Sequence, residues 1–402
     1  MSELLLLGVH SILTVEQLKL VADAALIVAS PRFQPQLAAF PARFQAIAPL
    51  DTAIAAMATA LEVGDKVVVL ASGDPLFFGI GKRLLREFPD AQITILPALS
   101  SVQLACALWR IPWEDAHILS LHGRELAHAG QLLRHEKTIV LTDKINSPDR
   151  LAAVLLDYFS QIGEVDLPEK IEMLVAEDLA LPEQKITSLS LTAAKGRRFS
   201  PLNVVCFRLP IEFIQGPPFV FGLTEEDIDH DAGMITKNEV RAAVLHALRL
   251  PATGVFWDVG GGSGSVSIEA ARLAPDLAIY TIECEAARLD AIRANIRRYH
   301  SFSVMPVAGK APMALASLPD PDRVFIGGGG AALAAIVAAA APRLRPGGRL
   351  VLTGVSERTI QSGPEIVARH DFTVRTTELC VTRDGQGGRK VFNPITIITG
   401  IK

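Results

Sequence analysis

The sequence predicts an α/β protein with two domains. Short apolar runs alternate with amphipathic helical patterns along the whole chain, which is typical of βαβ units. Half of the 402 residues are apolar, but only 6% are aromatic. That composition, rich in Ala, Val and Leu, suits the buried strands of parallel sheets. The length predicts two or three domains, and a cluster of prolines after residue 209 marks a boundary.

In the first half, a strand is expected at each run of Leu, Val or Ile, and a helix where apolar residues recur at helical spacing. The expected strands are residues 4–7, 25–29, 66–70, 92–96, 138–142, 170–176 and 202–209. The expected helices are residues 15–24, 79–87, 101–108 and 148–160. Residues 210–222 contain three prolines and no usable periodicity, so we expect a linker between domains of residues 1–209 and 223–402.

The second half resumes the alternation. The expected strands are residues 255–259, 278–282, 304–307, 324–326 and 349–353. The expected helices are residues 239–250, 266–273, 286–299 and 331–341. The last two apolar stretches, residues 372–381 and 392–401, are expected to form a terminal hairpin.

Charge, apolar runs and cysteines argue against several classes of protein. The net charge of −4 disfavours a protein that binds nucleic acid over its whole surface. The longest apolar run, residues 331–341, is shorter than the roughly 20 residues of a membrane-spanning helix, and the N-terminus lacks a signal-peptide pattern. The four cysteines are scattered singly, so neither a zinc site nor a disulfide framework is indicated. We expect a cytoplasmic protein without a metal, a membrane contact or a nucleic-acid partner.

The sharpest motif is the glycine-rich turn Asp258-Val-Gly-Gly-Gly-Ser-Gly-Ser265, between an expected strand and an expected helix. Glycines allow a tight turn and close approach to a ligand, and the first amides of the helix point to the same place. Glu283 ends the next strand, where an acid can accept both hydroxyls of an adenine ribose. Asp258 would repel a pyrophosphate but suits the ammonium of S-adenosylmethionine. The alternative is a turn that merely packs tightly.

These residues, with Asn295 and Arg345-Pro-Gly-Gly348, resemble the Rossmann-like core of class I methyltransferases. Residues 234–241 and 321–329 resemble, more narrowly, the C15-methylating, decarboxylating half of the precorrin methyltransferases. The strand at 324–326 ends without an Asn-Pro-Pro-Tyr-like motif, which leaves space for a flat macrocycle. The resemblance implies an S-adenosylmethionine site formed by Thr236, Asp258, Gly260, Gly261, Gly262, Ser263, Gly264, Glu283 and Ala311.

The first half carries a different pattern. Taken alone, the segment around Asp74-Pro75 reads as a plain strand-to-helix turn. With residues 97–101 and 120–124, it resembles the tetrapyrrole methylases, a class III family in which two α/β lobes hold S-adenosylmethionine between them. The resemblance implies that the cofactor cleft is lined by Asp74, Phe77, Ser100, Ser101 and Thr142. Residues 7–14 depart from the family's GxGPGxxxLLT stretch, since the central glycine and proline are missing, and this bears on the substrate pocket.

Together the two halves resemble the precorrin methyltransferases of cobalamin biosynthesis. The resemblance implies methylation of precorrin-6Y at carbons 5 and 15 and decarboxylation of the acetate on carbon 12, giving precorrin-8X, with one S-adenosylmethionine site per domain. Lys237, His230 and Glu357 are candidates to assist decarboxylation, although each is also an ordinary surface residue type. Arg124 and Arg241 are candidates to bind substrate carboxylates.

Other interpretations stay open at this point. One is a methyltransferase of RNA or of a protein side chain, and another is a fusion whose first half binds S-adenosylmethionine without catalysis. A third is a nicotinamide-linked oxidoreductase. By analogy with the two families, we expect a homo-oligomer. The fusion of the two halves, which is commoner on the oxygen-dependent route, favours a metal-free substrate.

Overall fold

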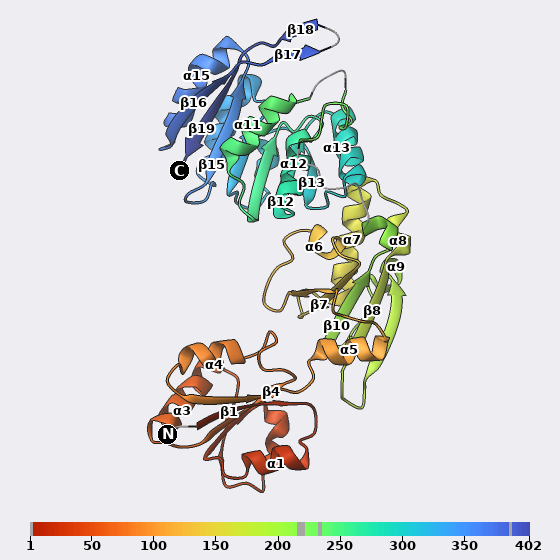
Figure 1. The fold of residues 1–402 in the computed structure, drawn as a ribbon, viewed down its shortest axis with the longest axis vertical. Coiled ribbons are helices and arrows are strands. Elements are labelled where there is room, and N and C mark those ends of the chain that lie inside the picture. Colours follow the sequence, from red (N-terminus) through yellow and green to blue (C-terminus); the bar gives the residue numbers. More distant parts are fainter. Residues whose placement is uncertain (1–2, 215–221, 232–234, 386–387) are drawn as a thin grey trace.

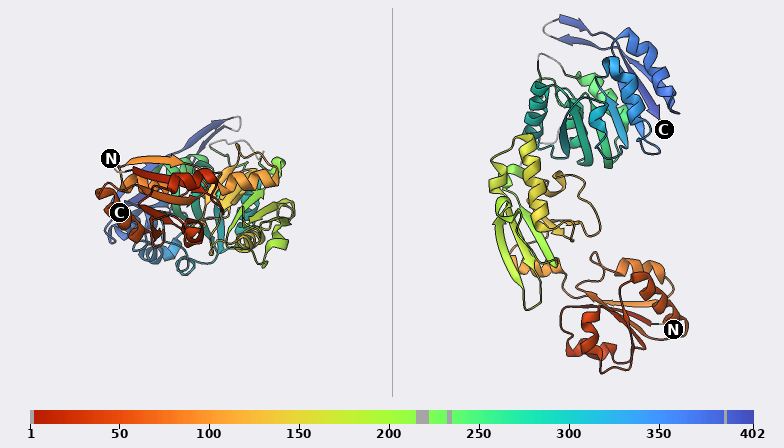
Figure 2. Two further views of the ribbon diagram at one scale, coloured as in Figure 1. Left: turned by 90° about the horizontal axis from the view of Figure 1, so that it is seen from below. Right: turned by 180° about the vertical axis from the view of Figure 1, so that it is seen from behind.

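The computed structural model describes residues 3–214, 222–231, 235–385 and 388–402. Figure 1 shows three α/β units in a row along the long axis of the molecule. We call them the first lobe (β1 to β5), the second lobe (α5 to β10) and the C-terminal domain (α11 to β19). The second lobe lies between the other two units in both long views (Figures 1 and 2).

The first lobe is a five-stranded parallel sheet of order β3-β2-β4-β1-β5. Its strands are β1 (Glu3–Val9), β2 (Leu26–Ala29), β3 (Arg43–Ala46), β4 (Val67–Ser72) and β5 (Gln92–Leu96). Its helices are α1 (Val15–Val21), η1 (Pro31–Phe33), α2 (Gln34–Leu37), α3 (Leu50–Glu62) and α4 (Gly81–Glu87). β1 is an unbroken apolar run because Leu4 and Leu6 enter one core cluster while Leu5 and Leu7 enter another.

The second lobe has a mixed sheet of order β6-β7-β10-β8-β9. Its strands are β6 (His117–Ser120), β7 (Lys137–Leu141), β8 (Glu172–Glu177), β9 (Lys185–Ser190) and β10 (Asn203–Arg208). Its helices are α5 (Ser101–Trp109), α6 (Gly130–Leu133), α7 (Pro148–Ile162), α8 (Leu167–Lys170) and α9 (Leu191–Ala194). Only β6 and β7 are parallel, and β10 runs antiparallel to both of its neighbours. The expected uniform βαβ pattern is therefore wrong here, because an apolar run marks a buried strand but not its direction.

The C-terminal domain has a seven-stranded sheet of order β13-β12-β11-β14-β15-β19-β16. Its strands are β11 (Thr253–Val259), β12 (Asp276–Glu283), β13 (Val304–Ala308), β14 (Arg323–Ile326), β15 (Arg349–Gly354), β16 (Thr373–Leu379) and β19 (Ile395–Ile401). Its helices are α11 (Asn238–Leu248), α12 (Ser265–Leu273), α13 (Ala286–Arg298), η2 (Met313–Leu315), η3 (Gly330–Ala332), α14 (Leu333–Ala340) and α15 (Glu357–Ala368). Five adjacent strands are parallel, which confirms the Rossmann-like expectation and the α/β class.

The expected terminal hairpin exists as the antiparallel pair of β16 and β19. A second, smaller hairpin of β17 (Thr382–Gly385) and β18 (Gly388–Val391) is inserted between those strands and projects from the domain in Figure 1. Helix α15 was not expected, because Gly363 and Pro364 interrupt its sequence pattern. Gly363 packs so closely on β19 that a Cβ atom there would lie 2.6 Å from Cδ1 of Ile398.

The second lobe and the C-terminal domain share one hydrophobic core cluster. The Tyr158 hydroxyl of α7 donates to the carbonyl of Val304 at 3.0 Å, and the amide of Gly130 donates to the carbonyl of Phe302 at 3.1 Å. In the expected linker, residues 215–221 lie outside the described residues, but helix α10 (Ile211–Ile214) lies before them. Its Phe213 ring stacks on Phe302, with the ring centroids 5.3 Å apart. These contacts hold the two units against each other.

No helix in the described part of the chain is long and apolar enough to cross a lipid bilayer. The apolar run at residues 331–341 instead forms the end of η3 and the short helix α14, whose buried side chains include Ile336 and Val337.

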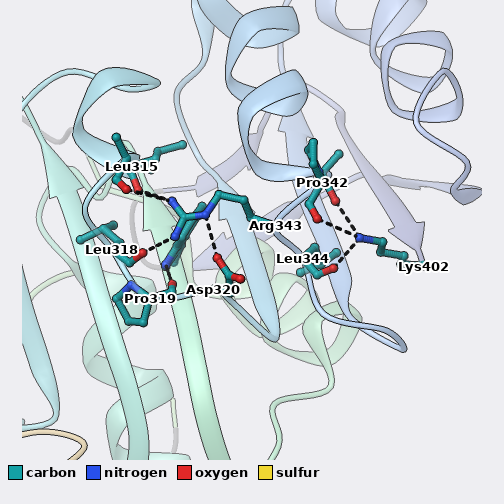
Figure 3. Close-up of polar contacts among 11 residues, drawn as sticks. Leu315, Leu318, Pro319, Asp320, Pro342, Arg343, Leu344 and Lys402 are labelled. Atoms are coloured by element: carbon teal, nitrogen blue, oxygen red, sulfur yellow. Dashed lines mark hydrogen bonds and ion pairs between the residues drawn. The ribbon is translucent and has the colours of Figure 1, made fainter.

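Two cations of the C-terminal domain donate hydrogen bonds to main-chain carbonyls (Figure 3). The Arg343 guanidinium donates to the carbonyl of Leu315 at 2.6 Å and to that of Leu318. The Lys402 ammonium donates to the carbonyl of Leu344 at 2.5 Å. The carbonyls of Leu318 and Leu344 lie after η2 and α14, where a charged donor supplies the hydrogen bond that a continuing helix would supply. The carbonyl of Leu315 also accepts from the amide of Leu318 at 3.2 Å.

We expect Arg343→Met to destabilise the C-terminal domain by about 3 kcal/mol. The variant loses the ion pair of Arg343 with Asp320 and leaves the two carbonyls without a charged donor. Urea unfolding followed by circular dichroism measures the change. Arg369→Met is the matched control, because Arg369 is 74% exposed and pairs only loosely with Glu365, so a change within roughly 0.5 kcal/mol is expected. Equal destabilisation by both variants would contradict the assignment.

Candidate functional site

A cleft of about 1060 Å³ lies between the first and second lobes. In the first lobe it is formed by the loops at the carboxyl ends of β1, β4 and β5, where ligands of open parallel sheets bind. All five residues predicted for the cofactor in this half line it: Asp74, Phe77, Ser100, Ser101 and Thr142. The folded chain thus brings together residues that are up to 68 positions apart in the sequence.

The polar groups of this cleft are held by local hydrogen bonds. A carboxylate oxygen of Asp74 accepts from the amide of Leu76 at 2.8 Å, which fixes the turn after β4. Ser100 begins α5 in a capping box with Gln103. The Thr142 hydroxyl is 2.7 Å from Oδ1 of Asn203. The cleft wall is therefore preorganised on both lobes.

The three loops of the first lobe are in close contact at Gly8. A Cβ atom on Gly8 would lie 2.3 Å from both the amide nitrogen of Ala98 and the carbonyl oxygen of Gly73. Only glycine fits there, which accounts for the one glycine that residues 7–14 share with the tetrapyrrole methylase pattern. The same loop places His10 and Ser11 on the cleft wall.

Two cleft cations were missed by the sequence analysis. Arg32 enters from η1, where its guanidinium donates to the Ser72 hydroxyl at 2.8 Å, and Lys144 enters from the second lobe. No motif marks either residue, since their proximity depends on how the lobes face each other. Arg124 is exposed and does not line the cleft, although its neighbours His122 and Gly123 do.

In the C-terminal domain, the glycine-rich turn lies at the carboxyl end of β11. The amides of Gly260 and Gly261 both donate to the carbonyl of Ile282, at 2.9 and 3.0 Å. Gly260 has a positive φ of 76°, and a Cβ atom on Gly261 would lie 2.2 Å from Cγ2 of Thr281. The turn is therefore restricted to glycine at these positions by conformation and by space.

Glu283 ends β12 beside this turn and is only 4% exposed. Its carboxylate accepts from the amide of Gly262 at 2.9 Å, from that of Cys284 at 2.8 Å and from that of Glu285 at 3.1 Å. The side chain thus joins the glycine turn to the start of α13. Ser263 and Gly264, which complete the turn, are buried.

Asp258 is buried behind the turn, with 1% of its surface exposed. One carboxylate oxygen accepts from the Ser267 hydroxyl at 2.6 Å, and the other has no hydrogen-bond partner among the described residues. Burial raises the pKa of Asp258 to about 6, and the nearby negative charge of Glu283 acts in the same direction. An unpaired acceptor at this position fits a cationic ligand group.

The residues before α11 form an ion-pair network. The Lys237 ammonium is 2.5 Å from a carboxylate oxygen of Glu225. Arg383, from β17 of the projecting hairpin, is 2.8 Å from Glu225 and makes two hydrogen bonds to Glu239, at 2.9 and 2.7 Å. Thr236, next to Lys237, is half-buried. These ion pairs join the projecting hairpin to the loop in which Thr236 lies.

Arg241 differs from the expectation of a substrate-facing arginine. It is 1% exposed, and its guanidinium donates to the carbonyls of Leu223 and Thr236. Glu269 from α12 lies 3.5 Å away as its counter-ion. Because its donors are directed into the domain, Arg241 organises the loop before α11 in this structure.

The remaining candidates are dispersed around the same end of the sheet. His230 is half-buried in the loop before α11, and Met234 of the motif at 234–241 lies outside the described residues. Glu357 is exposed in the first turn of α15. Ala311 is half-buried after β13, beyond Gly309, whose amide donates to the carbonyl of Glu283 at 2.9 Å.

Models of methyltransferase families match both halves of the chain. A family model described as tetrapyrrole (corrin/porphyrin) methylases matches residues 7–195, and one described as precorrin methyltransferase domain matches residues 227–399. A precorrin-6Y C(5,15)-methyltransferase [decarboxylating] of Sinorhizobium sp is 36% identical over 302 residues, which is 73% of this chain and 69% of that protein. The chain belongs to the precorrin-6Y C5,15-methyltransferase (decarboxylating) family. It is thus a methyltransferase of cobalamin biosynthesis whose families use S-adenosylmethionine, and the resemblance found in the sequence is confirmed.

Two relatives resemble parts of this precorrin-6Y C5,15-methyltransferase family member. A cobalt-precorrin-7 C(5)-methyltransferase of Salmonella typhimurium is 35% identical, over 39% of this chain and 75% of that protein. A cobalt-precorrin-6B C(15)-methyltransferase (decarboxylating) of the same organism is 39% identical, over 32% of this chain and 66% of that protein.

Proposed function

We propose that the two domains divide the reaction of the family between them. The domain of residues 1–209 methylates carbon 5, and the domain of residues 223–402 methylates carbon 15 and removes the acetate carboxyl of carbon 12, so that precorrin-6Y becomes precorrin-8X. The observation that carries this proposal is that candidate cofactor residues gather in two places, which we call cradles. One is the inter-lobe cleft and the other is the glycine-rich turn, and each lies at the carboxyl ends of parallel strands in a different sheet. The relatives that carry one activity each on separate chains support the division.

Each cradle is proposed to hold one S-adenosylmethionine, whose sulfonium supplies an activated methyl group when bound. In the first domain, Asp74, Ser100 and Ser101 present polar groups to it, Phe77 gives an apolar wall, and Thr142 closes the second-lobe side. Since the macrocycle is itself an electron-rich nucleophile, the residues mainly provide proximity, orientation and exclusion of water.

In the C-terminal domain, the residues present fit the same cofactor. The glycine-rich turn and Glu283 adjoin at the carboxyl ends of β11 and β12, and we propose that Glu283 accepts ribose hydroxyls there. The unpaired oxygen of Asp258 is proposed to pair with the ammonium of the methionine part. Thr236 and Ala311 complete the proposed set from the loops before α11 and after β13.

The acidic side chains of the macrocycle require cations. Arg32 lines the cleft from the first lobe and Lys144 lines it from the second, and we propose that both bind substrate carboxylates. Arg124, which lies outside the cleft lining, is kept as a further proposed contact for a carboxylate at the entrance. In the C-terminal domain, we propose Arg383 on the projecting hairpin in place of Arg241, because the Arg383 side chain is 35% exposed whereas Arg241 is buried.

For decarboxylation, we propose that Lys237 holds the reacting carboxylate. We propose His230 and Glu357, which lie at the same end of the sheet, as further groups that carry a proton. Lys237 must exchange Glu225 for the substrate, which their partly exposed positions allow: the side chains are 32% and 15% exposed. Burial of the reacting carboxylate away from water favours loss of carbon dioxide into the conjugated ring.

The number of cofactor sites tests this proposal directly. Calorimetric titration of the full chain with S-adenosylhomocysteine is expected to show two sites per chain. NADH is expected to give no binding heat. A single site, or NADH binding, would contradict the proposal.

Binding at the C-terminal site is expected to depend on pH. Because the pKa of Asp258 is raised to about 6, its carboxyl becomes neutral on acidification and can no longer pair with an ammonium. S-adenosylhomocysteine should therefore bind about tenfold more weakly at roughly pH 5 than at roughly pH 7. The folding stability of the free protein depends on pH in the opposite direction to the binding affinity. The raised pKa of Asp258 stabilises the fold at low pH, and this contribution is lost as the pH rises through about 6.

Calorimetric titrations of the parent and of Asp258→Asn measure this dependence. The variant should bind weakly at the C-terminal site at both pH values, while the cleft of the first domain serves as an internal reference. A parent affinity at the C-terminal site that does not change with pH would contradict the pairing of Asp258 with the ammonium.

A further inference from the structure

The loop after β1 has a central place in the inter-lobe cleft. β1 lies between β4 and β5 in the sheet, so its carboxyl end lies between the turns that carry Asp74 and Ser100. The amide of Gly73 donates to the carbonyl of Val9 at 2.9 Å, which joins the loop to the Asp74 turn. His10, the next residue, lines the cleft between the proposed cofactor contacts.

This loop is fixed from both lobes. The Ser11 hydroxyl donates to the carbonyl of Ala180 in the second lobe at 2.6 Å. Gln36 of α2 donates to the carbonyl of Ser11 at 2.9 Å and accepts from the amide of Leu13 at 2.9 Å. His10 is thus half-buried on a loop that hydrogen bonds fix to both lobes. It lies in the segment of residues 7–14, where the sequence departs from the tetrapyrrole methylase pattern.

Methylation of carbon 5 leaves a proton to be removed. The meso carbon carries one hydrogen, and the ring regains its conjugation only when that hydrogen leaves as a proton. The other titratable side chains that line the cleft are Arg32, Asp74, His122, Asp143 and Lys144. The arginine and the lysine are cations and cannot accept a proton.

The two carboxylates are engaged elsewhere. Asp74 accepts from the amide of Leu76. Asp143 accepts from the amides of Asn146, Gly123 and Ile145, and these hydrogen bonds hold the pKa of its carboxyl below the ordinary value. Asp143 is therefore a weak base, and one carboxylate oxygen of Asp74 is committed to its own turn.

The two histidines are the remaining bases, and they differ in position. His122 is exposed beside the positive-φ residue Gly123 on the rim. His10 is half-buried on the wall, beside the loops that carry the proposed cofactor contacts. An imidazole on a cleft wall that is held from both lobes suits the role of a general base.

We propose that His10 is the general base of the carbon 5 methylation, an inference that rests on the proposed function of this cleft. The bond between the methyl carbon and carbon 5 forms as the bond between sulfur and the methyl carbon breaks. The bond between carbon 5 and its hydrogen then breaks, its electron pair restores a double bond of the macrocycle, and the proton passes to a ring nitrogen of His10. No oxidant or reductant is needed.

The test uses the full chain with precorrin-6Y and S-adenosylmethionine, and it follows each methyl transfer by mass spectrometry. We expect His10→Gln and His10→Ala to slow the carbon 5 transfer about 100-fold, while methylation of carbon 15 and affinity for S-adenosylhomocysteine stay within about twofold of the parent. The parent rate should fall on acidification through the range in which imidazoles are protonated, and this fall should disappear in both variants. Added imidazole should partly restore His10→Ala.

His122→Gln is the matched control, because it removes the other imidazole of the cleft, and its rate and pH profile should equal those of the parent. A His10 variant with the parent's rate and pH profile would overturn the inference, as would slowing that follows weakened cofactor binding. A parent chain that methylates carbon 15 but not carbon 5 would overturn the proposed function of the cleft, and this inference with it.

Discussion

The Glu283→Ala variant is expected to make no carbon 15 methyl product and to release no carbon dioxide from precorrin-6Y. The substitution removes the carboxylate that accepts from the amides of Gly262, Cys284 and Glu285, and with it the proposed contact to the ribose hydroxyls. Hydrogen bonds to a charged group contribute about 1.5 to 3 kcal/mol each, so the C-terminal site should bind S-adenosylhomocysteine at least about 100-fold more weakly. Calorimetry should then detect one site per chain.

Glu285→Ala is the matched control for this prediction. Glu285 is also acidic and lies two residues further along, but its side chain is exposed, so cofactor binding and both products should be those of the parent. If Glu283→Ala kept two binding sites and released carbon dioxide at the parent rate, the proposed C-terminal site would be wrong.

A Gly8→Ala substitution is expected to abolish methylation of carbon 5. The added Cβ atom would lie 2.3 Å from backbone atoms of both Ala98 and Gly73, and a backbone cannot give way as a flexible side chain can. The three loops of the first lobe must move apart, which costs about 3 kcal/mol of stability and misplaces the cleft residues. Such displacement should slow the carbon 5 transfer at least about 100-fold.

The products and the unfolding curve measure this effect together. The variant should accumulate a product with one added methyl group that has lost carbon dioxide. Gly385→Ala is the control, since nothing lies within 4 Å of a Cβ atom there, and it should behave like the parent. Normal methylation of carbon 5 by Gly8→Ala would contradict the role given to the cleft.

The fold could be predicted where burial leaves a simple pattern. β1 could be predicted because it is an unbroken apolar run that is buried on both faces, and β5 because its apolar and polar residues alternate. α7 could be predicted because its apolar residues lie on one face. The signal for α3 is present, as Ala53, Met57 and Ala60 lie on one face, but small residues make that face weakly apolar. Strand direction in the second lobe was beyond prediction, because it depends on partners that the local sequence does not specify.

The site could be predicted where one short segment carries the geometry. The glycine turn and Glu283 lie on adjacent strands, so their spacing alone indicates a nucleoside site. Arg241 shows the opposite case: its charge suggested a substrate contact, whereas its counter-ion Glu269 comes from another helix and holds it inside the domain. Arg32 and Lys144 become neighbours of one cleft only when the two lobes meet, so no sequence pattern could reveal them.

We propose that one polypeptide transfers two methyl groups to one macrocycle from two cofactor sites. In the most direct measurement, the full chain is incubated with precorrin-6Y and S-adenosylmethionine that carries a labelled methyl group. The mass of the product is then determined by mass spectrometry. We expect the product to have gained two labelled methyl groups and to have lost one carbon dioxide. A product with a single labelled methyl group, or with its acetate carboxyl intact, would contradict this proposal.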